Sequence, residues 1–473
     1  MKKQLAIYLA MCAMALAFVS CLGDDNEDSV IVYPYASLLS FSVGNMELPV
    51  STVTDEGKDT TIIKSVAGSA YSFVIDDKNM QVYNRDSLPK GCNVSKVVTY
   101  VSCDGIPYFY QPESDTFEPV SSSDSIDFTS PRRLLIASTD GTYMREYTVT
   151  LNVHSVDPEE MSWSSLATPA VDKPVRAIPF KDKLLLYGCN AAGEAVVAAS
   201  TLSGDPSWGA PVAISAGLDE KALNTVTLFN ETLYMAQADG KLAQSADGYV
   251  WEYATGTTAY SANAAGFNLK TLLAASQQDG KMWAVASIDG AAADSIVYTT
   301  DGINFVTTTA VEQDFPCHRV SSAVYPLTTN ADITRYVLVG YATSQTDAAP
   351  VVWSKLSTED YWMQLVSDGD KKYNCPALEN LTVLHYDGML YAFGGAGVVA
   401  DEEIKPFAAL YMSRDNGLTW LQADDEYMKL PEALAGSDAP YAAVVDNNHR
   451  IWIITGGDTP QVWRGSINRL QFQ

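Results

Sequence analysis

The sequence has little of the material that metal centres, disulfide scaffolds and polyanion-binding surfaces require. Its 473 residues include seven cysteines and four histidines, all scattered, and no Cys-x-x-Cys pair. We therefore expect no metal site, no cofactor and no disulfide framework. Basic residues are also scarce, because 30 lysines and arginines stand against 57 aspartates and glutamates, for a formal net charge of −27. Phosphate backbones repel such a chain, which excludes nucleic acid as a partner.

The chain does contain the residues of a large folded core. Hydrophobic residues make up 47% of it, aromatic residues 10% and charged residues only 18%, a composition that argues against disorder. The length predicts two or three domains. Cys92 and Cys103 flank a strand-like run at residues 93–102. An extended strand of that length separates its ends by about 35 Å, so these two thiols should stay unpaired.

The first 33 residues predict a lipid-anchored envelope protein. Lys2 and Lys3 precede an apolar run at residues 5–19, which is too short for a membrane span and is typical of a signal peptide. The run ends in Phe-Val-Ser-Cys21, which resembles the lipobox of bacterial lipoproteins. Residues 1–20 would then be removed, and residues 21–33 form an acidic flexible tether, similar to the surface-export signal of Bacteroidota lipoproteins.

The resemblance implies that lipidated Cys21 attaches the protein to the outer membrane, on the cell surface or on its periplasmic face. Ordinary cleavage near Ser20, with Cys21 incidental, is the alternative.

Residues 34–156 predict an immunoglobulin-like β-sandwich. Short β-rich runs alternate with turn signals such as Asp104-Gly105 and Asp140-Gly141, and no helical period of useful length occurs. A linker is expected at residues 158–160. The predicted strands lie at residues 38–43, 60–63, 70–75, 94–101 and 145–153.

From about residue 161 the chain repeats itself. A turn followed by a short apolar strand recurs six times, with spacings of 49, 49, 54, 54 and 61 residues. In several copies a strand, a polar turn and an aromatic residue follow, as at residues 245–251, 299–305 and 413–420. Repeats near 50 residues predict β-propeller blades, so residues 161–473 predict a six-bladed propeller. The repeated strands contain Leu184, Leu233, Met282, Tyr336, Leu390 and Ile451.

Two strands compete to complete the last blade. One lies at residues 161–163 and the other at residues 470–472. The sequence leaves this choice open.

Two of the repeated motifs resemble known propeller families. The endings at Gly395 and Gly457 resemble kelch repeats, and Ser413-Arg-Asp-Asn-Gly-Leu-Thr-Trp420 resembles the Asp-box of sialidase-type propellers. We interpret the Asp-box as structural: Asp415 caps a hairpin turn, Gly417 takes a positive φ, and Trp420 is buried between blades. With the lipobox and the first domain, the whole chain resembles a family of uncharacterised Bacteroidota surface lipoproteins.

The sequence gives weak support to catalysis. The propeller has seven arginines, and they do not form the triad that a sialidase needs. Its three histidines occupy unrelated repeat positions, unlike those of a kelch-type copper oxidase. Acid pairs at residues 402–403 and 424–425 are interpreted as solvated loop residues. A carboxylate pair drawn from two blades stays open as an alternative, so a glycan-degrading exo-glycosidase or lyase is the second hypothesis, with no catalytic residue assigned.

The favoured hypothesis is binding at the rim of the propeller. Aligning the repeats places one polar residue of each blade near the start of its first strand. Arginines and amides there suit hydroxyl-rich or carboxylate-bearing ligands, and Tyr260, Phe315, Tyr373 and Tyr427 are expected as loop platforms for sugars. The chain is therefore predicted to bind a glycan or a protein partner, with the first domain as a spacer. The predicted rim residues are Arg176, Asn224, Lys270, Arg319, Asn380 and Tyr441.

Overall fold

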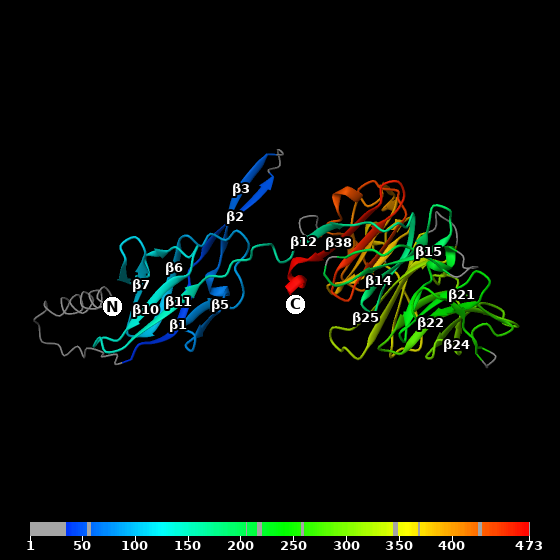
Figure 1. Cartoon of the computed structure of the whole chain (residues 1–473), viewed down its shortest axis with the longest axis horizontal. Helices are drawn as coiled ribbons and strands as arrows, with labels where there is room; N and C mark the ends of the chain where they lie inside the picture. The colour runs from blue at the N-terminus through cyan, green and yellow to red at the C-terminus, as the bar shows by residue number, and fades with distance from the viewer. Residues whose placement is uncertain are drawn as a thin grey trace, which may run out of the picture. The chain divides into compact units, whose positions relative to one another are not determined.

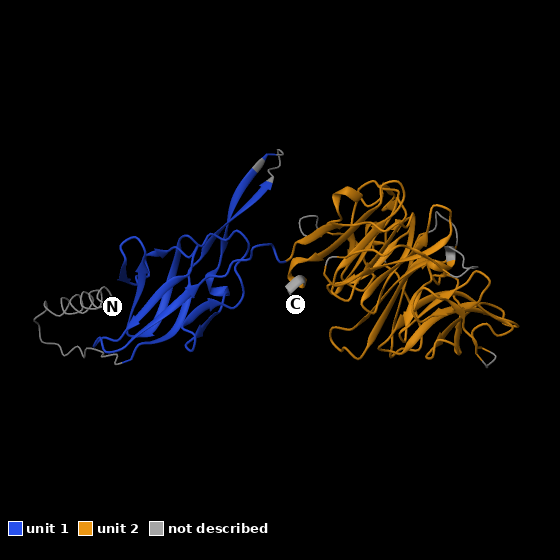
Figure 2. Ribbon diagram, in the orientation of Figure 1, with its two compact units in different colours: residues 1–158 blue, residues 159–473 orange. Residues whose placement is uncertain are grey.

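The protein is built almost entirely from β-strands, in two units that cover residues 1–158 and 159–473 (Figure 2). The division falls in the linker that the sequence predicts. No helix of the described residues is both long and apolar enough to cross a bilayer. The predicted signal peptide, the tether and Cys21 lie outside the described residues. The computed structural model describes residues 35–53, 58–204, 206–214, 220–256, 260–343, 349–367, 369–423 and 428–472.

In the first unit, a three-stranded and a six-stranded sheet bury their side chains in one hydrophobic cluster. Phe41 and Val97 come from the smaller sheet, and Phe109, Leu134 and Tyr147 come from the larger. The smaller sheet has the order β1 (Ser37–Val43), β6 (Val97–Asp104) and β9 (Ser125–Ile126). The larger has the order β4 (Phe73–Asp76), β5 (Gln81–Asn84), β11 (Met144–Thr150), β10 (Arg132–Ala137), β7 (Ile106–Gln111) and β8 (Thr116–Pro119).

A separate hairpin of this unit, β2 (Met46–Val53) and β3 (Asp59–Val66), extends away from both sheets (Figure 1). Its ladder runs from the pair Met46 and Val66 to the pair Val53 and Asp59. Cys92 and Cys103 of this unit form no disulfide, as expected. Burial raises the pKa of both thiols.

The described residues of the second unit form six four-stranded antiparallel sheets. The first three follow one another along the chain, and each is a simple meander. They are β13 (Lys173–Phe180), β14 (Lys183–Cys189), β15 (Ala195–Thr201) and β16 (Val212–Ala213); β17 (Thr227–Phe229), β18 (Thr232–Ala236), β19 (Leu242–Ser245) and β20 (Glu252–Tyr253); and β21 (Phe267–Ser276), β22 (Lys281–Ile288), β23 (Ser295–Thr299) and β24 (Phe305–Ala310).

The last three sheets complete the set. They are β25 (His318–Pro326), β26 (Thr334–Tyr341), β27 (Val351–Leu356) and β28 (Met363–Leu365); β30 (Thr382–Tyr386), β31 (Met389–Phe393), β34 (Tyr411–Ser413) and β35 (Leu421–Gln422); and β36 (Tyr441–Val445), β37 (Ile451–Thr455), β38 (Gln461–Ile467) and β12 (Met161–Leu166). The short helices among the described residues are α2 (Glu220–Leu223), η1 (Gly68–Ala70), η2 (Lys371–Tyr373), η3 (Glu432–Leu434) and η4 (Asn468–Phe472).

The six sheets of the second unit form a closed ring. The first strand of each sheet packs against the first strands of its two neighbours, in the cyclic order β13, β17, β21, β25, β30, β36 and back to β13. Such a ring of meanders is a β-propeller. The repeated apolar segments found in the sequence are the second strands of the sheets, β14, β18, β22, β26, β31 and β37.

The ring is held together by six hydrophobic clusters, each shared by two neighbouring sheets. The cluster between the last sheet and the first contains Trp452 and Ile454 of β37 and Leu184 and Leu186 of β14, all fully buried. A single sheet would leave these faces in water, so closure of the ring stabilises every blade.

The strand that completes the last sheet is β12. It pairs antiparallel with β38 over six residues, from Met161 opposite Ile467 to Leu166 opposite Val462 (Figure 1). The competing terminal segment lies instead in the 3₁₀-helix η4, where Arg469 forms ion pairs with Asp387 and Glu159. The last blade therefore combines strands from both ends of the unit.

The polar turns between third and fourth strands have the geometry that the sequence predicts. In the full copy, Asp415 Oδ1 accepts hydrogen bonds from Ser413 Oγ at 2.8 Å and from the Thr419 amide at 2.9 Å. Gly417 has φ +100°. Trp420 is buried, with its Nε1 donating to the Gly417 carbonyl at 3.0 Å. These residues shape the fold and lie on hairpins rather than in a binding site.

One of these turns predicts a dependence of stability on pH. Burial opposes ionisation of Asp301, but hydrogen bonds from Asn304, Ile303 and Thr299 outweigh it and lower its pKa to about 2. The carboxylate is therefore more stable in the folded state, and that contribution is lost as the pH falls from about 4 towards 2. Asp301→Asn should flatten the fall in melting temperature across this window. An unchanged acid profile in the variant would show that the Asp301 carboxylate does not stabilise the turn.

An additional three-stranded sheet is inserted into the fifth repeat. Its strands are β29 (Ala377–Leu378), β32 (Gly397–Val399) and β33 (Glu402–Ile404). This sheet was not predicted from the sequence. Glu402 and Glu403 lie in β33, so their predicted placement on a loop was wrong. Their side chains are exposed, as expected. The acid pair at residues 424–425 lies outside the described residues.

Candidate functional site

Five of the six predicted rim residues line one cavity of about 470 Å³, which we call the mouth cavity. They come from five of the six sheets or from the segments just before their first strands. Sequence reasoning missed the neighbouring Lys173, Ser321 and Thr382, which line the same cavity through adjacent positions on the first strands. The predicted residues in the mouth cavity are Arg176, Asn224, Arg319, Asn380 and Tyr441.

Lys270 does not line the mouth cavity, and the alignment of repeats misplaced it. It lies in β21, the longest of the first strands, at an irregularity between Leu269 and Thr271 that leaves it without a partner in the ladder. Its side chain is exposed. An extra residue in a ladder, a β-bulge, changes the direction in which the nearby side chains point. Repeat spacing alone does not reveal such a bulge.

The lining of the mouth cavity is electropositive. Lys173, Arg176 and Arg319 contribute three positive charges, and none of the described lining residues is an aspartate, glutamate, histidine or cysteine. In a chain whose net charge is −27, this is a local reversal of sign. It favours an anionic ligand, and it provides no carboxylate pair for hydrolysis.

Arg176 is the most distinctive of these cations. Its Nε donates to the Val226 carbonyl at 3.3 Å, and no carboxylate of the described residues forms an ion pair with it. Burial lowers the pKa of Arg176, although a guanidinium remains protonated in proteins. A cation with remaining N–H donors and no carboxylate partner is a ready partner for a ligand anion.

Tyr441 and Asn380 form a fixed part of the wall. The Tyr441 hydroxyl donates to the Asn380 carbonyl at 2.6 Å and lies 3.0 Å from Thr382 Oγ1. Burial raises the pKa of Tyr441, so this hydroxyl stays protonated at neutral pH. Asn380 has φ +49° and an exposed side chain, so its amide is available to a ligand. Asn224 is likewise exposed.

Arg319 is held by its neighbours. Its guanidinium lies over the ring of Tyr341, 3.7 Å from the centroid. Its backbone has φ +47°, a strained conformation for a residue with a Cβ. Strain of this kind gathers at functional sites, where surrounding structure fixes a side chain in one place.

The predicted aromatic platforms are only partly present. Phe315 is buried and packs against Trp353 and Trp362 in the core, so it is not available to a sugar. Tyr260 is 46% exposed, but it lines a different depression beside Phe305. Tyr373 is half-buried, and Tyr427 lies outside the described residues.

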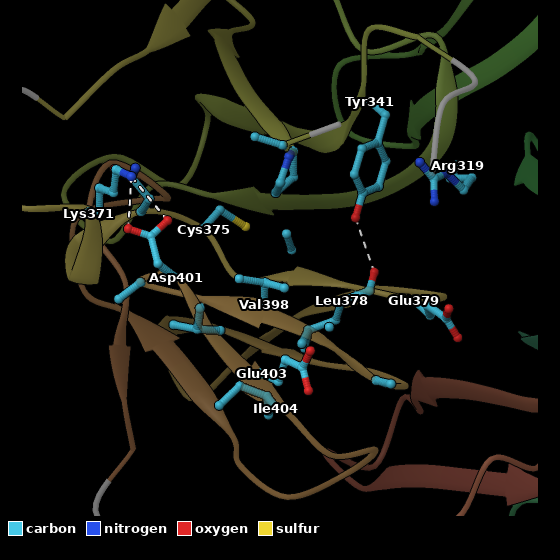
Figure 3. A pocket seen from close by; sticks show the side chains of 18 residues that line it. Arg319, Tyr341, Lys371, Cys375, Leu378, Glu379, Val398, Asp401, Glu403 and Ile404 are labelled. Carbon is cyan, nitrogen blue, oxygen red and sulfur yellow. Dashed lines mark hydrogen bonds and ion pairs between the residues drawn. The ribbon is translucent and has the colours of Figure 1, made fainter. Parts of the chain in front are cut away.

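A second cavity, of about 680 Å³, adjoins the inserted sheet. Figure 3 shows Arg319, Tyr341 and Glu379 at one end and the ion pair of Lys371 with Asp401 at the other. Between them lie apolar side chains and Cys375, whose pKa is raised by burial. Sequence reasoning missed this cavity because its floor is made by the unpredicted strands β29, β32 and β33.

The described residues contain no cluster of three or more histidine, cysteine, aspartate or glutamate side chains that could hold a metal ion.

The closed ring of sheets with a polar mouth defines a β-propeller protein. Residues 157–473 match the family model described as the DUF6242 beta propeller domain, and residues 41–151 match the model described as the DUF6242 N-terminal domain, a domain of unknown function. The chain belongs to the DUF6242 family.

Other comparisons add little. No curated protein matches the chain. Similar solved structures include a DUF4623 family protein from Bacteroides eggerthii, at 11% identity and a TM-score of 0.33, covering 90% of this chain and 97% of that one. An alpha-L-arabinanase from Penicillium chrysogenum is 15% identical, with a TM-score of 0.36 and coverage of 64% and 98%. YCF48 from Cyanidioschyzon merolae is 11% identical, with a TM-score of 0.34 and coverage of 64% and 98%. These TM-scores are too low for any of the three to carry an argument about this chain.

Proposed function

We propose that this protein is a binding module of the cell envelope, which captures a glycan or a protein partner in the mouth cavity without chemical turnover. In this proposal the second unit is a six-bladed propeller, one blade for each four-stranded sheet. The first unit is an immunoglobulin-like spacer. Lipidated Cys21 attaches the chain to the outer membrane, with the protein on the cell surface or, as the alternative, on the periplasmic face.

The observation that carries the proposal is the composition of the mouth cavity. Three cations, two side-chain amides and a fixed tyrosine line it, and the described lining includes no carboxylate, imidazole or thiol. Forked and charge-assisted hydrogen bonds from such groups recognise carboxylates and hydroxyls. General acid–base hydrolysis of a glycan would need carboxyl groups that this lining does not supply.

Replacing Arg319 with alanine tests this assignment. The variant loses a charge-assisted hydrogen bond to the ligand, so its Kd should rise roughly tenfold, which corresponds to about 1.5 kcal/mol. Its melting temperature should change little, because stacking on an aromatic ring at a half-exposed site contributes only about 0.5–1 kcal/mol. Binding measured by calorimetry that is unaffected by the substitution would remove Arg319 from the site.

The anchor has its own test. Cys21→Ser should abolish incorporation of a labelled fatty acid and release the mature protein from the membrane fraction, because the thiol is the acceptor of the lipid. A variant that stays labelled and membrane-bound would contradict the proposed lipidation.

A glycan-cleaving enzyme is the second candidate, favoured by one observation: Glu379 and Glu403 line the second cavity beside the mouth. A screen of host and dietary glycans, read both by binding and by release of shorter products, separates the two functions. Binding without product release supports the binding module. Turnover would establish the enzyme instead.

A further inference from the structure

The mouth cavity and the second cavity share a wall. Arg319 lines both of them. The segment 377–382 also runs from one to the other, because Leu378 and Glu379 line the second cavity while Asn380, Leu381 and Thr382 line the mouth. The two cavities are therefore neighbours, with Arg319 and this segment between them.

The two cavities differ in charge. The mouth cavity has three cations and no acid among its described lining residues. The second cavity shares Arg319 and adds Lys371, but it also has three carboxylates. Lys371 is engaged by Asp401, with its Nζ 2.8 Å and 3.0 Å from the two carboxylate oxygens. Glu379 and Glu403 form no ion pair with any described residue, so their oxygens remain available as acceptors.

This contrast suits a ligand with two chemically different parts. Carboxylates accept hydrogen bonds from sugar hydroxyls, whereas they repel an acidic sugar. The apolar side chains of Leu378, Val398 and Ile404 lie among the lining of the second cavity and can pack against the C–H faces of a sugar ring (Figure 3). Both volumes, about 470 and 680 Å³, are in the range that ligand pockets occupy.

We infer that the ligand is an oligosaccharide with a carboxylate-bearing sugar at one end, which sits between Arg176 and Arg319, and with neutral sugars that continue past Arg319 into the second cavity. This inference rests on the proposed function and adds to it the class of ligand, its orientation and a second subsite. Arg319, stacked on Tyr341 at the shared wall, is the residue that both parts of the ligand contact.

The test uses calorimetry on the full chain with five kinds of probe. They are free uronic and sialic acids; acidic oligosaccharides in which one such sugar is joined to one or two neutral sugars; oligouronides with an acid on every ring; neutral oligosaccharides of equal length; and sulfated counterparts of the acidic set. The mixed acidic oligosaccharides should bind at least about tenfold more tightly than the free acid, because further hydrogen bonds form in the second cavity. Neutral oligosaccharides, oligouronides and sulfated probes should all bind more weakly.

Variants assign each part of the ligand. Arg176→Ala should weaken binding of every acidic probe by roughly 150-fold in Kd. The double variant Glu379→Gln and Glu403→Gln should bind the free acid like the wild type but lose the gain with length, and circular dichroism should confirm that it folds. Lys270→Ala is the matched control, since it removes an exposed positive charge from a first strand that lines neither cavity.

The possible failures are distinct. Equal affinity for the free acid and the longer probes would overturn the second subsite while leaving the mouth as the binding site. Tighter binding of oligouronides would overturn the proposed orientation, and tighter binding of sulfated probes would overturn the carboxylate. Binding that ignores Arg176→Ala would overturn the mouth cavity as the binding site, and no binding of any acidic probe would overturn an acidic glycan as the ligand of the proposed function.

Discussion

Replacing Arg176 with alanine should weaken binding of a carboxylate-bearing ligand by about 3 kcal/mol, roughly 150-fold in Kd, and should not lower the melting temperature. The guanidinium is partly buried and donates one hydrogen bond, to the Val226 carbonyl, without an ion-pair partner among the described residues. In the free protein such a charge contributes little to stability. In the complex it donates charge-assisted hydrogen bonds to an anion, which are stronger than bonds between neutral groups.

The matched control is Arg414→Ala. Arg414 is an exposed arginine in the hairpin turn after β34, and it does not line the mouth cavity. The Arg414→Ala variant should bind the ligand with the wild-type Kd. If the two variants bound equally well, the charge of Arg176 would have no part in recognition, and a large fall in melting temperature for Arg176→Ala would show that its role is structural.

Replacing Trp420 with alanine should destabilise the propeller by about 3–5 kcal/mol, the cost of removing a fully buried aromatic side chain. Trp420 belongs to the hydrophobic cluster shared by the fourth and fifth sheets, where it packs with Val337, Val352 and Leu390. Its loss opens a cavity between two blades and leaves the Gly417 carbonyl without its Nε1 donor. Calorimetry of the full chain should show a lower transition for the propeller while the transition of the first unit stays in place.

Tyr361→Ala is the control for Trp420, since the Tyr361 side chain is 61% exposed. It should leave the propeller transition unchanged. A Trp420→Ala protein as stable as this control would contradict the view that packing between neighbouring sheets holds the ring closed.

The blades were predictable from the sequence because each second strand is short, apolar and preceded by a turn. Strands of this kind, such as β31 with Leu390 and Tyr391, are buried on both faces and therefore have a strong and regular signal. The ring follows from the number of repeats, because a single four-stranded sheet cannot bury both of its faces, whereas several sheets packed side by side can.

The closing strand was not predictable, because it depends on competition between two segments. β12 forms a six-residue ladder with β38, whereas the terminal residues turn into η4. Side chains decide the outcome: Arg469 binds Asp387 and Glu159, and Ser162 Oγ donates to Asn468 Oδ1 at 2.6 Å. Such contacts between the two ends of the unit leave no periodic pattern in the sequence.

The mouth was largely predictable, and the second cavity was not. Five of the residues found by aligning the repeats line one cavity, because the first strands start at one end of the ring. Lys270 lies outside this cavity, at a bulge in β21. Phe315, expected separately as a loop platform for sugars, is buried in the core shared by the third and fourth sheets. The inserted strands β29, β32 and β33 have two or three residues each, too few for an alternating pattern to appear.

A crystal structure of the protein with a bound acidic oligosaccharide tests the role of the mouth most directly. We expect the carboxylate of the ligand within hydrogen-bond distance, about 2.7–3.0 Å, of the Arg176 guanidinium, with the remaining sugars passing Arg319. Density for the ligand on another surface, with Arg176 still bonded only to the Val226 carbonyl, would contradict the assignment of the mouth cavity as the binding site.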